Sequence, residues 1–110
     1  MERHGLEHAD LAVVGQNHYR GNILALFREH AEPFAQELEI DALIEPEPTN
    51  THDPSAVVVK VRGYIVGYIA QQNAAKVRAA IGSGLRVRLR LISNHDPEHP
   101  ACSAVVTSVI

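Results

Sequence analysis

One stretch decides the fold of this chain: Glu45-Pro46-Glu47-Pro48-Thr49-Asn50-Thr51-His52-Asp53-Pro54-Ser55-Ala56, followed at once by Val57-Val58-Val59-Lys60-Val61. Its prolines and acidic residues predict a stiff, acidic loop, because proline fixes its own φ angle. The β-branched valines that follow predict a buried strand. We therefore expect the side chains of Asn50 and Asp53 to be held at the lip of a β-sheet by turn chemistry.

The segments on either side of this loop also have the pattern of strands. Residues 38–45 and 86–92 alternate between apolar and polar side chains, which is the period of a half-buried strand. Arg62-Gly63 is a hairpin signal. We expect a mainly β fold, a closed or nearly closed antiparallel barrel with two α-helices, one of which covers an opening. The expected elements, in the order β-α-β-β-β-α-β-β, are residues 11–15, 23–29, 38–45, 57–61, 64–70, 71–81, 86–92 and 103–110.

The size and composition are those of one globular domain. The chain has 110 residues, of which 45% are apolar, so we expect residues 11–110 to form a single domain behind a flexible N-terminus of residues 1–10. The net charge of −3 argues against a protein that coats duplex DNA. The single cysteine, the lack of a long apolar run and the lack of a signal-peptide pattern predict a cytoplasmic protein that is not in a membrane.

The Asn50/Asp53 turn has two compatible interpretations. In the first, both side chains form hydrogen bonds to nearby backbone groups and fix the loop before Pro54. In the second, the Asp53 carboxylate accepts a hydrogen bond from a ligand. An ionised carboxylate only accepts hydrogen bonds, so it favours a sugar hydroxyl and repels a phosphate. Asn50 could therefore hold the turn while Asp53 faces outward.

A second group of candidate residues follows the first expected strand. Residues 16–22, predicted to be a polar turn, include Asn17, His18, Tyr19 and Arg20. An aromatic ring beside a cation is the usual arrangement for binding a single nucleic-acid strand, and a solvated loop is the alternative.

Gly67 and Tyr68 lie inside the expected strand at residues 64–70. Glycine there indicates a bulge or a close backbone approach. If Tyr64 and Tyr68, spaced by four, share the outer face, Tyr68 would form a second wall of a groove. The alternative is that Tyr68 is an ordinary half-buried tyrosine.

Two further patterns have weaker functional meaning. Arg86, Arg88 and Arg90 form a stripe that could track a nucleic-acid backbone, although such a stripe is more often a solvated face, here paired with acidic residues of 37–41. His95, His99 and Cys102 are residue types that bind zinc, but their spacing is not that of a zinc motif. The sequence contains no recognisable catalytic set or phosphate-binding loop, so we expect neither enzymatic activity nor a cofactor or metal.

Three segments together resemble the HIRAN domain family: residues 13–22, residues 45–59 and Val66-Gly67-Tyr68-Ile69, in their proper order. The core of the resemblance is Glu-Pro-x-x-Asn-x-x-Asp-x-x-Ala-Val joined to the downstream Gly-Tyr. It covers residues 11–110. It implies a modified OB-like β-barrel that binds single-stranded DNA and captures a free 3′-hydroxyl end.

The resemblance also implies roles for individual residues. Asp53 would accept the 3′-hydroxyl, His18 and Tyr19 would flank the terminal bases, and Tyr68 would line the pocket. Asn17 stands where the eukaryotic domain has a phosphate-contacting arginine, and one stacking ring is also lost, with Arg20 as a nearby source of charge. The expected DNA-binding residues are Asn17, His18, Tyr19, Arg20, Asn50, His52, Asp53 and Tyr68.

The sequence therefore predicts a nucleic-acid-binding module for a single-stranded DNA end, acting in DNA repair or replication-fork processing. A helicase, ATPase or nuclease partner would be a separate chain. Two alternatives remain at this point. The chain could be a protein–protein adaptor that docks through valine-rich surfaces, or a zinc-dependent hydrolase or its accessory domain that uses His95, His99 and Cys102.

Overall fold

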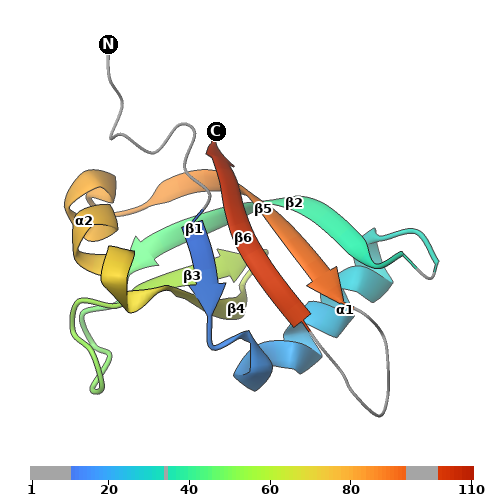
Figure 1. Ribbon diagram of the computed structural model, residues 1–110, viewed down its shortest axis with the longest axis horizontal. Helices are drawn as coiled ribbons and strands as arrows, with labels where there is room; N and C mark the ends of the chain where they lie inside the picture. The colour runs from blue at the N-terminus through green and yellow to red at the C-terminus, as the bar shows by residue number, and fades with distance from the viewer. Residues whose placement is uncertain (1–10, 34, 94–101) are drawn as a thin grey trace.

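The computed structural model describes residues 11–33, 35–93 and 102–110. Within these residues the strands form a closed antiparallel barrel in the order β1-β4-β3-β2-β5-β6 (Figure 1). The elements are β1 (Leu11–Val14), the 3₁₀ helix η1 (Gln16–Tyr19), α1 (Arg20–His30), β2 (Glu37–Pro46), β3 (Val57–Val61), β4 (Tyr64–Ile69), α2 (Gln71–Ile81), β5 (Leu85–Ser93) and β6 (Cys102–Val109).

The predicted fold class and the predicted order of strands and α-helices are confirmed. The chain is mainly β, with a six-strand antiparallel barrel and two α-helices in its described part, consistent with an OB-like barrel. The polar turn predicted at residues 16–22 was wrong, because η1 occupies its first half and α1 already begins at Arg20. A tertiary contact compensates for the weak helix propensity of this first turn, since Asn22 Nδ2 donates a hydrogen bond to the Ile65 carbonyl at 2.8 Å.

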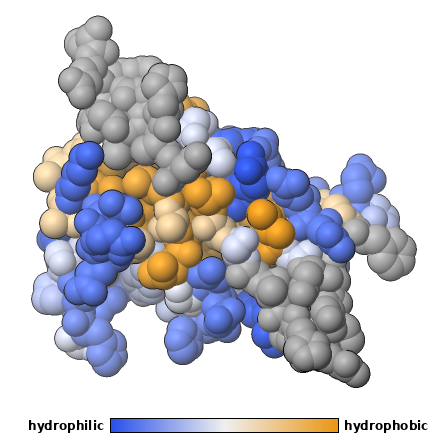
Figure 2. Space-filling model, in the orientation of Figure 1, coloured by the Kyte–Doolittle hydropathy of each residue, from blue (hydrophilic) through white to orange (hydrophobic). Residues whose placement is uncertain are grey.

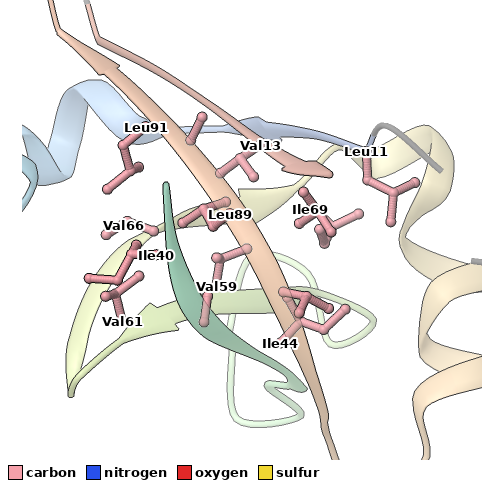
Figure 3. Packing of buried hydrophobic residues seen from close by; sticks show 14 of the residues in the cluster. Leu11, Val13, Ile40, Ile44, Val59, Val61, Val66, Ile69, Leu89 and Leu91 are labelled. Atoms are coloured by element: carbon pink, nitrogen blue, oxygen red, sulfur yellow. The ribbon is translucent and has the colours of Figure 1, made fainter. Parts of the chain in front are cut away.

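The hydrophobic core fills the inside of the barrel, where aliphatic side chains from its strands point toward one another (Figure 3). Strands β2 and β5 alternate as predicted, with Ile40, Ile44 and Leu89 buried. In β3, Val58 is buried as well as the inward-facing Val57 and Val59. The valine-rich strand β3 is therefore part of the core and does not supply a surface for docking.

Both helices supply side chains to this core. Ile23, Leu26 and Phe27 are buried on α1, and Val77 and Ile81 are buried on α2, at the helical spacing read from the sequence. Figure 1 shows α1 and α2 on opposite sides of the barrel. The sequence predicted that a helix would cover one opening, whereas the structure uses both helices to complete the core.

A bulge in β4 decides where Tyr68 points. Val59 pairs with Gly67 and Lys60 pairs with Ile65, so Val66 is an extra residue in β4. Tyr64 consequently packs against the core, and Tyr68 lies two positions after this shift on the opposite face. The possibility that Tyr64 and Tyr68 share the outer face was wrong for this reason.

Gly67 also allows β4 to approach β1 closely. A Cβ atom at this position would lie 2.7 Å from Val13 Cγ1 and 2.7 Å from the Val14 carbonyl oxygen. Both features that the sequence indicated for this glycine, a bulge and a close backbone approach, are therefore present.

Candidate functional site

The loop between β2 and β3, residues 47–56, is built around Asn50 and lies beside the start of α2 (Figure 1). Asn50 Oδ1 accepts hydrogen bonds from the backbone N–H groups of His52 and Asp53, at 2.9 Å each. Its Nδ2 donates to Glu47 Oε1 at 3.0 Å. The prediction that Asn50 holds the turn is confirmed, and these bonds fix the direction in which the loop presents Asp53.

Asp53 uses one of its carboxylate oxygens to brace the loop. Its Oδ1 accepts hydrogen bonds from the Ser55 hydroxyl at 2.7 Å and from the Ser55 backbone N–H at 3.0 Å. These bonds hold the pKa of Asp53 below its usual 3.8, so the side chain is an ionised acceptor at neutral pH. Within the described part of the chain, no hydrogen bond to Oδ2 is found.

Tyr68 faces the same loop from β4. Its hydroxyl donates a hydrogen bond to Glu47 Oε1 at 2.8 Å. Burial raises the pKa of the Tyr68 phenol far above its usual 10.0, and the hydrogen bond to Glu47 raises it further. The ring of Tyr19, from η1, lies with its centroid 6.3 Å from that of Tyr68 and tilted by 50°, which is a favourable aromatic pair.

These side chains surround a pocket of about 380 Å³. Five of the eight predicted site residues line it, namely Tyr19, Asn50, His52, Asp53 and Tyr68. The remaining lining residues are Val14, Ala56, Ile69 and Gln71. The pocket thus joins η1, the loop at residues 47–56, the end of β4 and the first residue of α2.

The other three predicted residues do not line this pocket. Asn17 and His18 are exposed on η1, and Arg20 is half-buried at the start of α1. Asn17 and His18 precede Tyr19 in η1, and Arg20 follows it as the first residue of α1.

Sequence reasoning missed Glu47 and the pocket-lining residues Val14, Ala56, Ile69 and Gln71. Val14 is 44% exposed and occupies an outward position of β1, a position that the alternation of the strand could have indicated. Gln71 is the first residue of α2. Glu47 does not itself line the pocket, but it receives hydrogen bonds from two residues that do, and only the three-dimensional structure brings Tyr68 to it.

The pocket has an acidic character. Among the described residues that line it, none is lysine or arginine. The positive charge of Arg78 on α2 also lowers the pKa of Asp53, and Arg78 Nη1 donates a hydrogen bond to the Pro54 carbonyl. An ionised acceptor beside aromatic rings and without a paired cation can receive a hydrogen-bond donor from a ligand.

The arginine stripe is paired within the fold. Arg88 Nη1 lies 2.7 Å from Asp41 Oδ1, and Arg90 Nε lies 3.0 Å from Glu37 Oε1. Arg86 Nη2 lies 3.9 Å from Asp41 Oδ2. The prediction that the stripe is a solvated face paired with acidic residues of β2 is confirmed.

The zinc hypothesis rests on side chains that the structure does not describe. His95 and His99 lie outside the described residues, and so does the side chain of Cys102. In residues 11–33, 35–93 and 102–110, no group of three His, Cys, Asp or Glu side chains could hold a metal ion. Over the same ranges, every helix is too short or too polar to cross a membrane.

Comparisons with protein-family models, with curated proteins and with solved structures find no match to this chain.

Proposed function

We propose that this protein is a binding module for single-stranded DNA that takes a free 3′-hydroxyl end into the pocket between Tyr19, Asp53 and Tyr68. The observation that carries the proposal is the ionised Asp53, whose Oδ2 accepts no hydrogen bond from the described residues, in a pocket that an aromatic pair also lines. The resemblance of residues 11–110 to the HIRAN family supports the same ligand.

The chemistry of the pocket suits a strand end better than the middle of a strand. A terminal base would stack on the tyrosine rings, since aromatic stacking accepts any base. The 3′-hydroxyl would donate to Asp53 Oδ2. A phosphate at the same position would meet like charge, so both an internal nucleotide and a 3′-phosphate end would be disfavoured.

Few cations are available for the DNA backbone. Arg20, next to Tyr19 in the chain, and Arg78, which contacts Pro54, are candidates, while the stripe on β5 is already ion-paired. Binding through so few phosphate contacts would be weak and would depend only shallowly on salt. A cytoplasmic module of this kind would act with a separate helicase, ATPase or nuclease chain.

The test is fluorescence anisotropy at low salt with two labelled oligonucleotides that differ only in a 3′-hydroxyl or a 3′-phosphate. We expect the hydroxyl end to bind at least about tenfold more tightly, because a hydrogen bond to a charged group contributes about 1.5–3 kcal/mol. In Asp53→Asn, the remaining oxygen can still accept from Ser55 while an amide replaces Oδ2. The preference should therefore disappear without loss of the fold.

Asp41→Asn is the matched control, because it removes an acidic side chain that is 53% exposed and paired with Arg88 on another face. It should keep the preference for the hydroxyl end. Equal binding of both ends by the unchanged protein, or an unchanged preference in Asp53→Asn, would contradict end recognition.

An adaptor role is the second candidate, and an apolar surface favours it. Figure 2 shows hydrophobic residues gathered on the face that carries β1 and β6. Ala12 and Val14 are exposed on β1, and Ala12 pairs with the half-buried Val105 of β6. A stoichiometric protein partner in a pull-down, together with flat DNA titrations, would favour this role over DNA binding.

A further inference from the structure

Glu47 connects two walls of the pocket. Its Oε1 atom accepts a hydrogen bond from the Tyr68 hydroxyl at 2.8 Å and another from Asn50 Nδ2 at 3.0 Å. Glu47 is half-buried, and its backbone N–H donates to the Ala56 carbonyl at 2.9 Å, which closes the base of the loop. Because a carboxylate is only an acceptor, both Tyr68 and Asn50 must direct a proton toward Glu47.

This arrangement determines which polar groups face the pocket. The Tyr68 proton points to Glu47, so its oxygen is left as an acceptor. Asn50 Oδ1 is occupied by two backbone N–H groups, and Asn50 Nδ2 is occupied by Glu47. Asp53 is an ionised acceptor. The pocket-lining side-chain donors that remain belong to Tyr19, whose hydroxyl interacts with that of Tyr68, and to His52 and Gln71, whose side chains are exposed.

We propose that Glu47 is the specificity-determining residue of this site: by fixing the protons of Tyr68 and Asn50, it makes the inner wall a set of acceptors. The ligand is then a strand terminus that carries its own hydrogen-bond donor, and a terminal phosphate is rejected. This inference rests on the proposed function, and it adds the chemical feature that the end must have.

Four oligonucleotides of one sequence test the donor requirement. They end in a 3′-amine, a 3′-hydroxyl, a 3′-hydrogen or a 3′-phosphate. An acceptor wall beside aromatic rings ranks them in that order, because the protonated amine adds charge to its donors, the hydrogen offers no donor and the phosphate is repelled. Each of the first two steps should be about tenfold in Kd at low salt, because the first removes the charge of the donor and the second removes the hydrogen bond to the Asp53 carboxylate.

Glu47→Gln tests the residue itself. The amide can donate to the Tyr68 oxygen, which releases the Tyr68 proton to turn toward the pocket, so the preference for hydroxyl over phosphate should fall about tenfold. Glu45→Gln is the matched control, because Glu45 lies in the same segment and carries the same charge. Its Oε1 pairs with Lys60 Nζ at 2.6 Å instead of with Tyr68, so this variant should keep the preference.

A spectroscopic readout separates positioning from a general structural effect. In Glu47→Gln, the pKa of the Tyr68 phenol should fall toward its usual value, because a hydrogen bond to a carboxylate is lost. Ultraviolet titration of the tyrosines follows this change, and the thermal midpoint reports whether the fold is intact. Glu45→Gln should leave the highest tyrosine pKa where it is.

The outcomes distinguish the two proposals. If the unchanged protein binds all four ends equally or binds none, the proposed function fails. If it ranks hydroxyl above phosphate and Glu47→Gln keeps the same ratio, only the role of Glu47 is overturned. Should Glu47→Gln unfold, Tyr68→Phe decides, since it keeps the ring and removes the hydroxyl acceptor. If Tyr68→Phe prefers the amine and hydroxyl ends over the hydrogen and phosphate ends as strongly as the unchanged protein does, the inference is overturned.

Discussion

The pocket and the outer face of β2 and β5 both carry charged side chains, but they balance their charge differently. On the β2–β5 face, Arg88 and Arg90 are each within ion-pair distance of acidic residues on the neighbouring strand. In the pocket, the Asp53 carboxylate is held by the neutral Ser55. One region is electrostatically complete within the fold, and the other has an acceptor left for a ligand.

This difference shows that a charged pattern becomes a binding site only when the fold leaves it unpaired. The arginine stripe has the composition usually associated with nucleic-acid binding. Its antiparallel pairing with β2 brings Arg90 opposite Glu39 and Arg88 opposite Asp41, so its charge is already compensated. The composition of the acidic loop is not typical of nucleic-acid binding, yet this loop holds the Asp53 carboxylate, which can still accept a hydrogen bond from a ligand.

The largest expected effect on stability comes from a substitution at Gly67, where β4 approaches β1 closely beside the pocket. In Gly67→Ala, the new Cβ would meet the Val14 carbonyl oxygen and a Val13 methyl group at 2.7 Å. We expect a loss of about 2–3 kcal/mol in the free energy of unfolding, as for an overpacked core, together with weaker binding of DNA ends. Urea denaturation and anisotropy measure the two effects.

Gly21→Ala is the control for this prediction. No atom would lie within 4 Å of its new Cβ, and Gly21 sits in α1, where alanine is the better helix former. It should be neutral or stabilising by about 0.5–1 kcal/mol. If both variants have the same stability, the close contact of β4 with β1 is not as tight as described.

A smaller effect is expected from titrating Asp53. Its pKa is lowered in the folded state, so its ionised form contributes stability that is fully present above the usual pKa of 3.8. That contribution is lost as the pH falls through the lowered pKa. The difference in unfolding free energy between the unchanged protein and Asp53→Asn should therefore be constant at higher pH and shrink only below 3.8. Denaturation at several pH values measures it, and a change near neutral pH would contradict the assignment.

The smallest effect is expected on the arginine face. The double variant Asp41→Arg with Arg88→Glu exchanges the two charges and keeps both the ion pair and the net charge. The two side chains are 53% and 41% exposed, so we expect a change in stability within about 1 kcal/mol and no change in DNA affinity. A clear loss of affinity by anisotropy would mean that this face takes part in binding after all.

The sequence was sufficient for the elements that depend on local pattern. Alternation in residues 38–45 and 86–92 marked β2 and β5, and helical spacing marked the inner side of α2. The bonds of Asn50 also followed from turn chemistry, because they span three residues or fewer.

What could not be predicted depends on contacts between distant segments. Gly67 indicated a bulge in this strand, but the sequence did not show that the bulge reverses the face of Tyr68 relative to Tyr64. Glu47 meets Tyr68 across the loop, and the start of α1 depends on Asn22 reaching Ile65. These three features required the three-dimensional arrangement of the barrel.

The closure of the barrel has a consequence for how the protein forms. Strand β1 pairs with β4 through Val13 and Ile69 and with β6 through Leu11 and Val106, so its partners lie far along the chain. Pairings of such long sequence separation are slow to form, because the entropy of the intervening chain is lost before they add stability. The pocket draws on segments from Val14 to Gln71, and the arginine face joins β2 to β5. Neither the pocket nor the arginine face can therefore form from one half of the sequence. Both regions form only when the chain folds as a whole.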